Sequence, residues 1–278
     1  MPATEGMTMS VSADVSLTNA STIQRNSLDD SRVGIARLLW LLWAVLLSAG
    51  ILADNLGSGF YSAFGRLGSS VVLIAAAWVW HSACHFTAVA RYSRLIAIGM
   101  TLGAIGDFFM AGLLQRWIVL PKPELGGMLA FGLGHVVYIV GCFEARRSAR
   151  LTSGSAMFKS VIAWQAISVV GWYLVVYLST KESTRLLVWP ALPYSQLLAG
   201  TAGVATGLAV QNKRFSVVAV GAALFLLSDL VLAWGMFRGT FPHRTEAVWI
   251  PYGVGQMMIV YGIHYASRAF STKTLPGQ

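Results

Sequence analysis

The stretch Gly221-Ala-Ala-Leu-Phe-Leu-Leu-Ser-Asp-Leu-Val-Leu-Ala-Trp-Gly235 carries one carboxylate, Asp229, inside an otherwise apolar run. The next charge downstream, Arg238, follows this acid by nine residues. An ionised Asp in the middle of a lipid-facing helix costs about 2.5–3.5 kcal/mol on insertion scales, so such residues usually face the interior of a bundle and have a function. The stretch therefore predicts a membrane-spanning helix that turns Asp229 inward.

The composition of the chain is that of an integral membrane protein. Hydrophobic residues make up 56% and charged residues 11% of the 278 residues, and the mean hydropathy is +0.64. Soluble domains carry about 25% charged residues. The net charge of +9 is spread along the chain in single residues or small groups between apolar runs. A nucleic-acid-binding surface needs clustered basic residues, so the sequence predicts no nucleic-acid partner.

Eight apolar runs are long enough to cross a bilayer, which needs about 20 residues of helix. The polar residues 1–34 lack the apolar core of a signal peptide and are expected to form a disordered cytoplasmic tail. Residues 35–268 form the predicted membrane domain, and residues 269–278 form a polar C-terminal tail. The runs predict an all-α fold, a bundle of eight transmembrane helices over residues 35–53, 67–84, 95–114, 125–143, 158–178, 186–210, 215–237 and 248–266.

The basic residues predict the orientation of this bundle. Thirteen of the 20 Lys and Arg residues fall on the side of the two termini, and the largest cluster is Arg146, Arg147 and Arg150. Cytoplasmic loops of membrane proteins carry the excess of basic residues. We therefore expect both termini in the cytoplasm and the protein in a bacterial inner (cytoplasmic) membrane.

A second acid, Asp107, also lies well inside a predicted span. Asp107 and Asp229 each precede the next basic residue, Arg116 or Arg238, by nine residues. The helical rise of 1.5 Å per residue puts both carboxylates about 13 Å from the outer ends of their spans. A single buried Tyr or His in a membrane protein is most often a group that hydrogen-bonds two helices together. Here, however, several polar residues share one level and predict a polar pocket: His135, Tyr138, Tyr194, Ser228, Tyr252 and Gln256.

His81 and His85 have the i, i+4 spacing of a metal-binding helix face. Counted along the second span they lie toward the cytoplasmic side, away from both acids, and the sequence offers no third ligand there. Cys84 and Cys142 lie inside apolar runs without metal-like spacing and are expected to be small buried side chains. The sequence therefore predicts no metal and no cofactor, and it carries no P-loop, dinucleotide fingerprint or serine-hydrolase elbow.

Short motifs follow one another along the predicted spans. They are Gly103-x-x-Gly-Asp107, Phe131-Gly-Leu-Gly-His135-x-x-Tyr138, Tyr194, Phe225-Leu-Leu-Ser-Asp229 and Trp249-x-Pro-Tyr252-x-x-Gly-Gln256. Each motif is short, but the combination, over residues 35–268, resembles the YhhN-like family of eight-span membrane proteins. The animal relatives in that family are lysoplasmalogenases.

The resemblance implies an integral-membrane hydrolase that cleaves the vinyl ether of lysoplasmalogens to a fatty aldehyde and a glycerophospho-alcohol. Protonation of a vinyl carbon starts this reaction and water captures the oxocarbenium ion, so two carboxyl groups suit it, as in glycosidases. Asp107 and Asp229 would then be catalytic. The substrate, a lysophospholipid-like amphiphile, would come from the membrane lipids and contact His135, Tyr138, Tyr194, Ser228, Tyr252 and Gln256.

Three other functions fit parts of the same pattern. Paired intramembrane acids also occur in proton-coupled transporters, although the sequence has no visible inverted repeat. A metal-dependent lipid hydrolase would combine His81 and His85 with a carboxylate, which their different depth disfavours. A non-catalytic lipid-binding membrane protein would keep the fold without the chemistry.

Overall fold

The computed structural model describes residues 6–84 and 89–270, with side chains from Ser31 onward except those of Gln115 and Arg116. His85 therefore lies outside the described residues. Helices account for nearly all of the described chain. The eight α-helices are α1 (Gly6–Asn55), α2 (Gly59–Cys84), α3 (Ala90–Met110), α4 (Pro123–Ser148), α5 (Gly154–Val175), α6 (Arg185–Gln211), α7 (Ser216–Phe237) and α8 (Arg244–Phe270).

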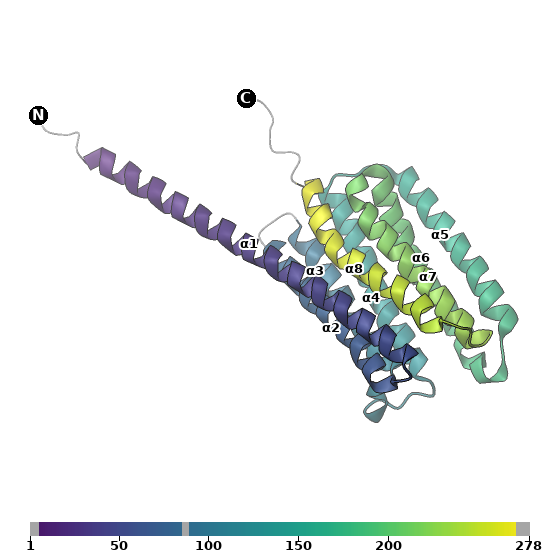
Figure 1. Cartoon of the computed structure of the whole chain (residues 1–278). Coiled ribbons are helices and arrows are strands. Elements are labelled where there is room, and N and C mark those ends of the chain that lie inside the picture. Colours follow the sequence, from purple (N-terminus) through teal and green to yellow (C-terminus); the bar gives the residue numbers. More distant parts are fainter. Residues whose placement is uncertain (1–5, 85–88, 271–278) are drawn as a thin grey trace, which may run out of the picture.

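The helices form one bundle of roughly antiparallel neighbours (Figure 1). Each odd-numbered helix packs against the even-numbered helix that follows it. Helix α6 contacts both α4 and α7, and α8 closes the other side of the bundle against α2 and α3. These contacts confirm the predicted all-α, eight-helix architecture.

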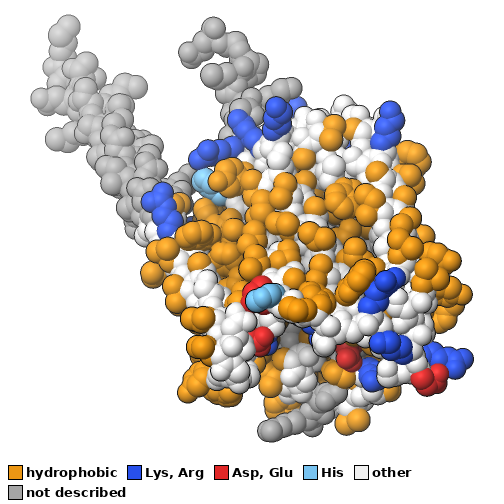
Figure 2. All heavy atoms as spheres, turned by 45° about the vertical axis from the view of Figure 1, so that its right-hand side comes forward, with side chains coloured by type: hydrophobic (Ala, Val, Ile, Leu, Met, Phe, Trp, Pro, Cys, Tyr) orange, Lys and Arg blue, Asp and Glu red, His pale blue; other side chains and the backbone are white. Residues whose placement is uncertain are grey.

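Six of the described helices are long and apolar enough to cross a membrane: α1 from Ser31, α2, α3, α4, α5 and α7. Helices α6 and α8 have 27 residues each, about 40 Å of helix, and pack within the same bundle. Figure 2 shows hydrophobic side chains in a broad band around the middle of the visible face, with Lys and Arg side chains gathered toward its two ends. This distribution is typical of a protein that spans a bilayer.

Most helix ends differ by a few residues from the predicted spans, and two of the differences affect residues near the site. Gly112 adopts a positive φ of 71°, which ends α3 at Met110 and leaves Leu113–Arg116 as a 3-10 turn, so the third predicted span was too long at its end. Helix α2 begins at Gly59 instead of residue 67. Arg66 therefore lies inside α2, where an ion pair with Asp54 at 3.6 Å keeps its charge compatible with the helix.

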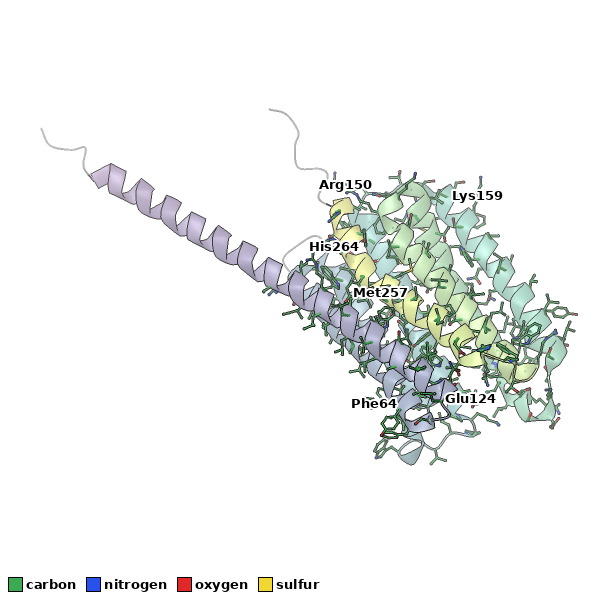
Figure 3. All side chains as sticks on the ribbon, in the orientation of Figure 1. Phe64, Glu124, Arg150, Lys159, Met257 and His264 are labelled. Atoms are coloured by element: carbon green, nitrogen blue, oxygen red, sulfur yellow. The ribbon has the colours of Figure 1, made fainter. Side chains whose placement is uncertain are left out.

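The chain ends leave two predictions open. Helix α1 begins at Gly6 in the structure, no side chain before Ser31 is described, and residues 271–278 lie outside the described part. The tails over 1–34 and 269–278 therefore stay predictions. The end of the bundle that carries Arg150 and Lys159 is opposite the end that carries Phe64 and Glu124 (Figure 3), but which end faces the cytoplasm also stays a prediction.

Glycines bring two helix pairs into close contact. A Cβ atom on Gly221 of α7 would lie 2.7 Å from the carbonyl oxygen of Gly255 in α8, and a Cβ on Gly255 would lie 2.7 Å from that of Gly221. Between α3 and α4, a Cβ on Gly99 would lie 2.3 Å from the ring of Tyr138. Small residues of this kind let membrane helices approach closely and gain van der Waals contact. They hold α3, α4, α7 and α8 around the polar residues described next.

Candidate active site

Asp107 lies in the last turn of α3, with 5% of its surface exposed. Ser70 of α2 donates a hydrogen bond to its Oδ2 at 2.6 Å. The hydroxyl of Tyr252 in α8 lies 2.7 Å from Oδ1 and 2.8 Å from Oδ2. Side chains from two neighbouring helices thus fix the orientation of this carboxyl group.

A chain of hydrogen bonds continues from Tyr252 into the bundle. Gln256 donates from Nε2 to the Tyr252 hydroxyl at 2.9 Å, and the Tyr138 hydroxyl of α4 donates to Oε1 of Gln256 at 3.4 Å. Gly103 leaves room for the amide, since a Cβ there would lie 3.1 Å from Nε2. Tyr138 and Gln256 therefore act on Asp107 through Tyr252 and do not touch it themselves.

Asp229 lies in α7, and the hydroxyl of Tyr194 in α6 donates a hydrogen bond to its Oδ2. Ser228, although adjacent in sequence, is fully buried and donates to the carbonyl of Phe225 at 3.0 Å, within its own helix. Asp229 is half-buried, less enclosed than Asp107, and Tyr194 is a side chain from a neighbouring helix that orients it.

Two adjoining cavities meet at Asp229. The larger one, about 300 Å³, is lined by both Asp107 and Asp229 and also by Arg66 and Arg244. The smaller one, about 100 Å³, lies between α4, α5, α6 and α7, and most of its wall is apolar. The residues that border both cavities are Met110, Glu124, Phe131, Asp229, Leu232 and Met236. Two carboxyl groups, those of Glu124 and Asp229, thus lie where the more polar and the apolar cavity join.

The predicted pocket residues divide into two groups. Tyr194 lines the apolar cavity and Tyr252 lines the polar one. The others lie behind the cavity walls, so a direct contact of these residues with substrate stays a prediction: His135, Tyr138, Ser228 and Gln256.

His135 is not part of the described hydrogen bonds that lead to Asp107 or Asp229. Its Nδ1 lies 2.9 Å from the Thr201 hydroxyl of α6, and its ring meets Phe225 edge-on at 4.6 Å between centroids. Its Nε2 is buried and has no hydrogen-bond partner in the described part of the chain. His135 therefore links α4 to α6. The sequence predicted it at the depth of the two acids, but its hydrogen bond and its ring contact are to Thr201 and Phe225.

Sequence reasoning missed several polar residues around the two cavities. Glu124 was not predicted as a pocket residue, because it lies at the outer end of the fourth span. In the structure Glu124 borders both cavities, and its Oε2 is buried without a hydrogen-bond partner among the residues whose side chains are described. Ser70 offered no signal beyond its place in the middle of an apolar run. Arg66 and Arg244 were counted as loop charges.

The described residues contain no group of three or more His, Cys, Asp and Glu side chains that could hold a metal ion. His81 of α2 has its Nδ1 3.1 Å from the Ser93 hydroxyl of α3. Cys84 and Cys142 are buried, as the sequence predicted.

Fold and site together define a polytopic membrane protein with a carboxylate-lined cavity inside the bundle. Residues 64–263 match the YhhN family, and the chain belongs to that family. The match includes both acids and every predicted pocket residue. Human lysoplasmalogenase TMEM86B is 26% identical over 168 residues, which cover 60% of this chain and 62% of that protein. No solved structure matches the chain.

Proposed function

We propose that this protein hydrolyses the vinyl ether bond of a lysoplasmalogen, releasing a fatty aldehyde and a glycerophospho-alcohol. The observation that carries the proposal is that Asp107 and Asp229 line one cavity, which adjoins an apolar cavity at Asp229. Family membership and the name of the human relative, a lysoplasmalogenase, support the same reaction.

The apolar cavity suits the part of the hydrocarbon chain next to the vinyl ether. Its wall includes Ile167 and Gly171 of α5 and Leu230 of α7. Ile167 is 54% exposed on the lipid-facing surface of the bundle, so the cavity reaches that surface. The remainder of a long chain would leave between α5 and α7 into the bilayer. A single-chain amphiphile could therefore enter without leaving the membrane.

Of the two proposed catalytic acids, Asp229 is the proposed proton donor because it borders both cavities, where the bond between chain and head group would lie, whereas Asp107 lines only the larger one. Its carboxyl proton is transferred to the vinyl carbon next to the hydrocarbon chain, and the other vinyl carbon becomes part of an oxocarbenium ion. Asp107, as a carboxylate, stabilises that cation and accepts a proton from the attacking water, which gives a hemiacetal. Breaking the bond from that carbon to the glycerol oxygen, with proton return to the oxygen, yields aldehyde and alcohol. One water is consumed.

The hydroxyl groups of two tyrosines orient the carboxyl groups for this sequence. Tyr252 donates to Asp107 and Tyr194 donates to Asp229, each from a neighbouring helix. Ser70 supplies a second donor to Asp107. Acyl-ester chemistry would instead need a nucleophile with an adjacent base. The proposed site therefore selects for a bond that is cleaved by protonation.

Purified protein tests this proposal with two matched substrates, a lysoplasmalogen and the lysophospholipid that carries an ester in place of the vinyl ether. We expect aldehyde release from the first and no fatty acid release from the second. Fatty acid from the ester substrate at a comparable rate would contradict the proposal, and so would the absence of aldehyde from the lysoplasmalogen.

We also propose that both termini lie in the cytoplasm of a bacterium, with the carboxylate cavity in the outer half of the inner membrane. The excess of basic residues on the side of the termini supports this orientation. A phosphatase or fluorescent-protein fusion after Phe270 tests it. Fluorescence without phosphatase activity is expected, and the reverse would contradict the orientation.

A further inference from the structure

Two arginines line the larger cavity, and they come from different helices. Arg66 lies in α2, and Arg244 is the first residue of α8. Neither belongs to the proposed chemistry. Buried or half-buried guanidinium groups are costly unless an anion or several hydrogen-bond acceptors face them. The partners of these two groups are therefore informative.

Arg66 is fixed by an ion pair and a ring contact, but one of its N–H donors is not used in the described part of the chain. Its side chain is 20% exposed, its Nη1 lies 3.6 Å from Oδ1 of Asp54, and its guanidinium lies 5.1 Å from the centre of the Trp249 ring. Asp54 already accepts hydrogen bonds from Ser62 at 2.9 Å and from Thr245 at 2.5 Å. The Nε of Arg66 is buried and has no hydrogen-bond partner among the side chains and backbone that the structure describes. Part of its donor capacity is thus unused.

Arg244 has no hydrogen bond or ion pair within residues 31–84 and 89–270, whose contacts the structure describes. Its guanidinium lies directly over Gly235 of α7, where a Cβ atom would be 2.4 Å from Nε and 3.0 Å from Cζ. The absence of a side chain at residue 235 therefore makes room for this guanidinium at the cavity wall. Its N–H donors have no acidic partner among the described residues.

We propose that Arg66 and Arg244 form a binding site for the phosphodiester of the lipid head group. Two guanidiniums with unused N–H donors match the two non-bridging oxygens and the single negative charge of such a group. Because Asp107, Asp229 and Glu124 line the same cavity, the two arginines decide where an anion can bind in it. With the phosphate at this site and the hydrocarbon chain in the apolar cavity, the glycerol and the vinyl ether would lie between the two, near Asp229, which borders both cavities. The assignment rests on the proposed function for its choice of a lysophospholipid.

Binding measurements test the phosphate site without relying on catalysis. The probe is a lysophospholipid with a saturated alkyl ether, which has no vinyl group to cleave, and its neutral counterpart is the alkylglycerol of the same chain length. Both are titrated against the full-length protein in nanodiscs. Arg66→Met and Arg244→Met should each lose at least about tenfold in affinity for the phosphate-bearing lipid, the loss expected when a charge-assisted hydrogen bond is removed. Affinity for the alkylglycerol should stay within about twofold.

Two control variants separate phosphate binding from folding and from general charge. Arg238 lies at the same end of the bundle but lines neither cavity, and it donates to the Leu174 carbonyl at 2.8 Å, so Arg238→Met should bind like the wild type. Asp54→Asn removes the ion pair of Arg66 and should bind the phosphate-bearing lipid at least as tightly as the wild type. If Asp54→Asn loses as much affinity as Arg66→Met, the effect is structural and the proposal is wrong.

The remaining outcomes distinguish this proposal from the hydrolase itself. Equal losses for both lipids, or no loss in either arginine variant, would overturn the phosphate site even if the protein cleaves vinyl ethers. Selective loss for the phosphate-bearing lipid would support the site even if wild-type protein released no aldehyde. Inorganic phosphate, titrated as a competitor, should displace the lipid only weakly. Displacement at equal concentrations would show a site for free phosphate and overturn the assignment to a lipid head group.

Discussion

Tyr252→Phe removes one oxygen from the centre of the site and leaves the ring in place. The lost hydroxyl donates to Asp107 at 2.7 Å and accepts from Gln256 at 2.9 Å. A hydrogen bond to a charged group contributes about 1.5–3 kcal/mol, which corresponds to a roughly 10- to 150-fold fall in rate if it acts in the transition state. Interhelical hydrogen bonds in membranes contribute on average about 0.6 kcal/mol to stability. The variant loses one interhelical bond, to Asp107, and one bond within α8, from Gln256, so the free energy of unfolding should fall by only about 1 kcal/mol.

The assay compares kcat for aldehyde release with the unfolding midpoint in the same preparation. Tyr261→Phe is the matched control, because Tyr261 lies on the same helix and donates its hydroxyl to the Ala36 carbonyl, away from both cavities. We expect the control to keep wild-type kcat. If Tyr252→Phe stays within about twofold of the wild type, or if both variants lose rate equally, Tyr252 does not orient a catalytic carboxylate.

Three further substitutions test other parts of the account. Gly235→Ala should displace the flexible guanidinium of Arg244 and weaken binding of the alkyl-ether lysophospholipid about tenfold. The free energy of unfolding should change by less than about 1 kcal/mol. Unchanged affinity would contradict the role of Arg244 in binding. Ala191→Leu adds bulk to the wall of the apolar cavity and should raise KM for long-chain more than for short-chain substrates, whereas equal effects would mean that the chain binds elsewhere. Gly99→Ala forces a methyl group against the buried ring of Tyr138 and should cost about 1–3 kcal/mol of stability, and an unchanged unfolding midpoint would refute the close α3–α4 contact.

That the two acids share a cavity could be predicted, because membrane helices have a fixed rise and charged residues mark their ends. Counting back from Arg116 and Arg238 put Asp107 and Asp229 at one level, and both line the same cavity in the structure. The predicted equal distances to the helix ends were wrong, because α3 ends at Met110, in the turn that holds Asp107, whereas α7 continues from Asp229 to Phe237. The apolar runs likewise gave the eight helices, although α2 begins at Gly59 instead of residue 67. These are properties along the helix axis, which the sequence encodes directly.

Direction around the helix axis was much harder to predict. His135 shares the level of the acids, but it faces Thr201 and Phe225, because the packing of α4 on α6 sets its direction. Arg66 was interpreted as a loop charge, because the sequence does not show that it pairs with Asp54 at the end of another helix. Glu124 was not among the predicted pocket residues for a similar reason. Which polar groups share a cavity depends on contacts between helices, and a single sequence carries little information about those contacts.

The central claim is that two intramembrane carboxyl groups in one cavity carry out the hydrolysis. It is tested most directly by the rate of aldehyde release from lysoplasmalogen by Asp107→Asn and Asp229→Asn, measured beside Arg238→Met and with binding of the alkyl-ether lipid as a check on folding. A positioned acid or base contributes about 10²- to 10⁴-fold. We predict that each Asn variant loses at least 10²-fold in kcat and still binds the lipid. A rate within about twofold of the wild type in either variant would contradict the account.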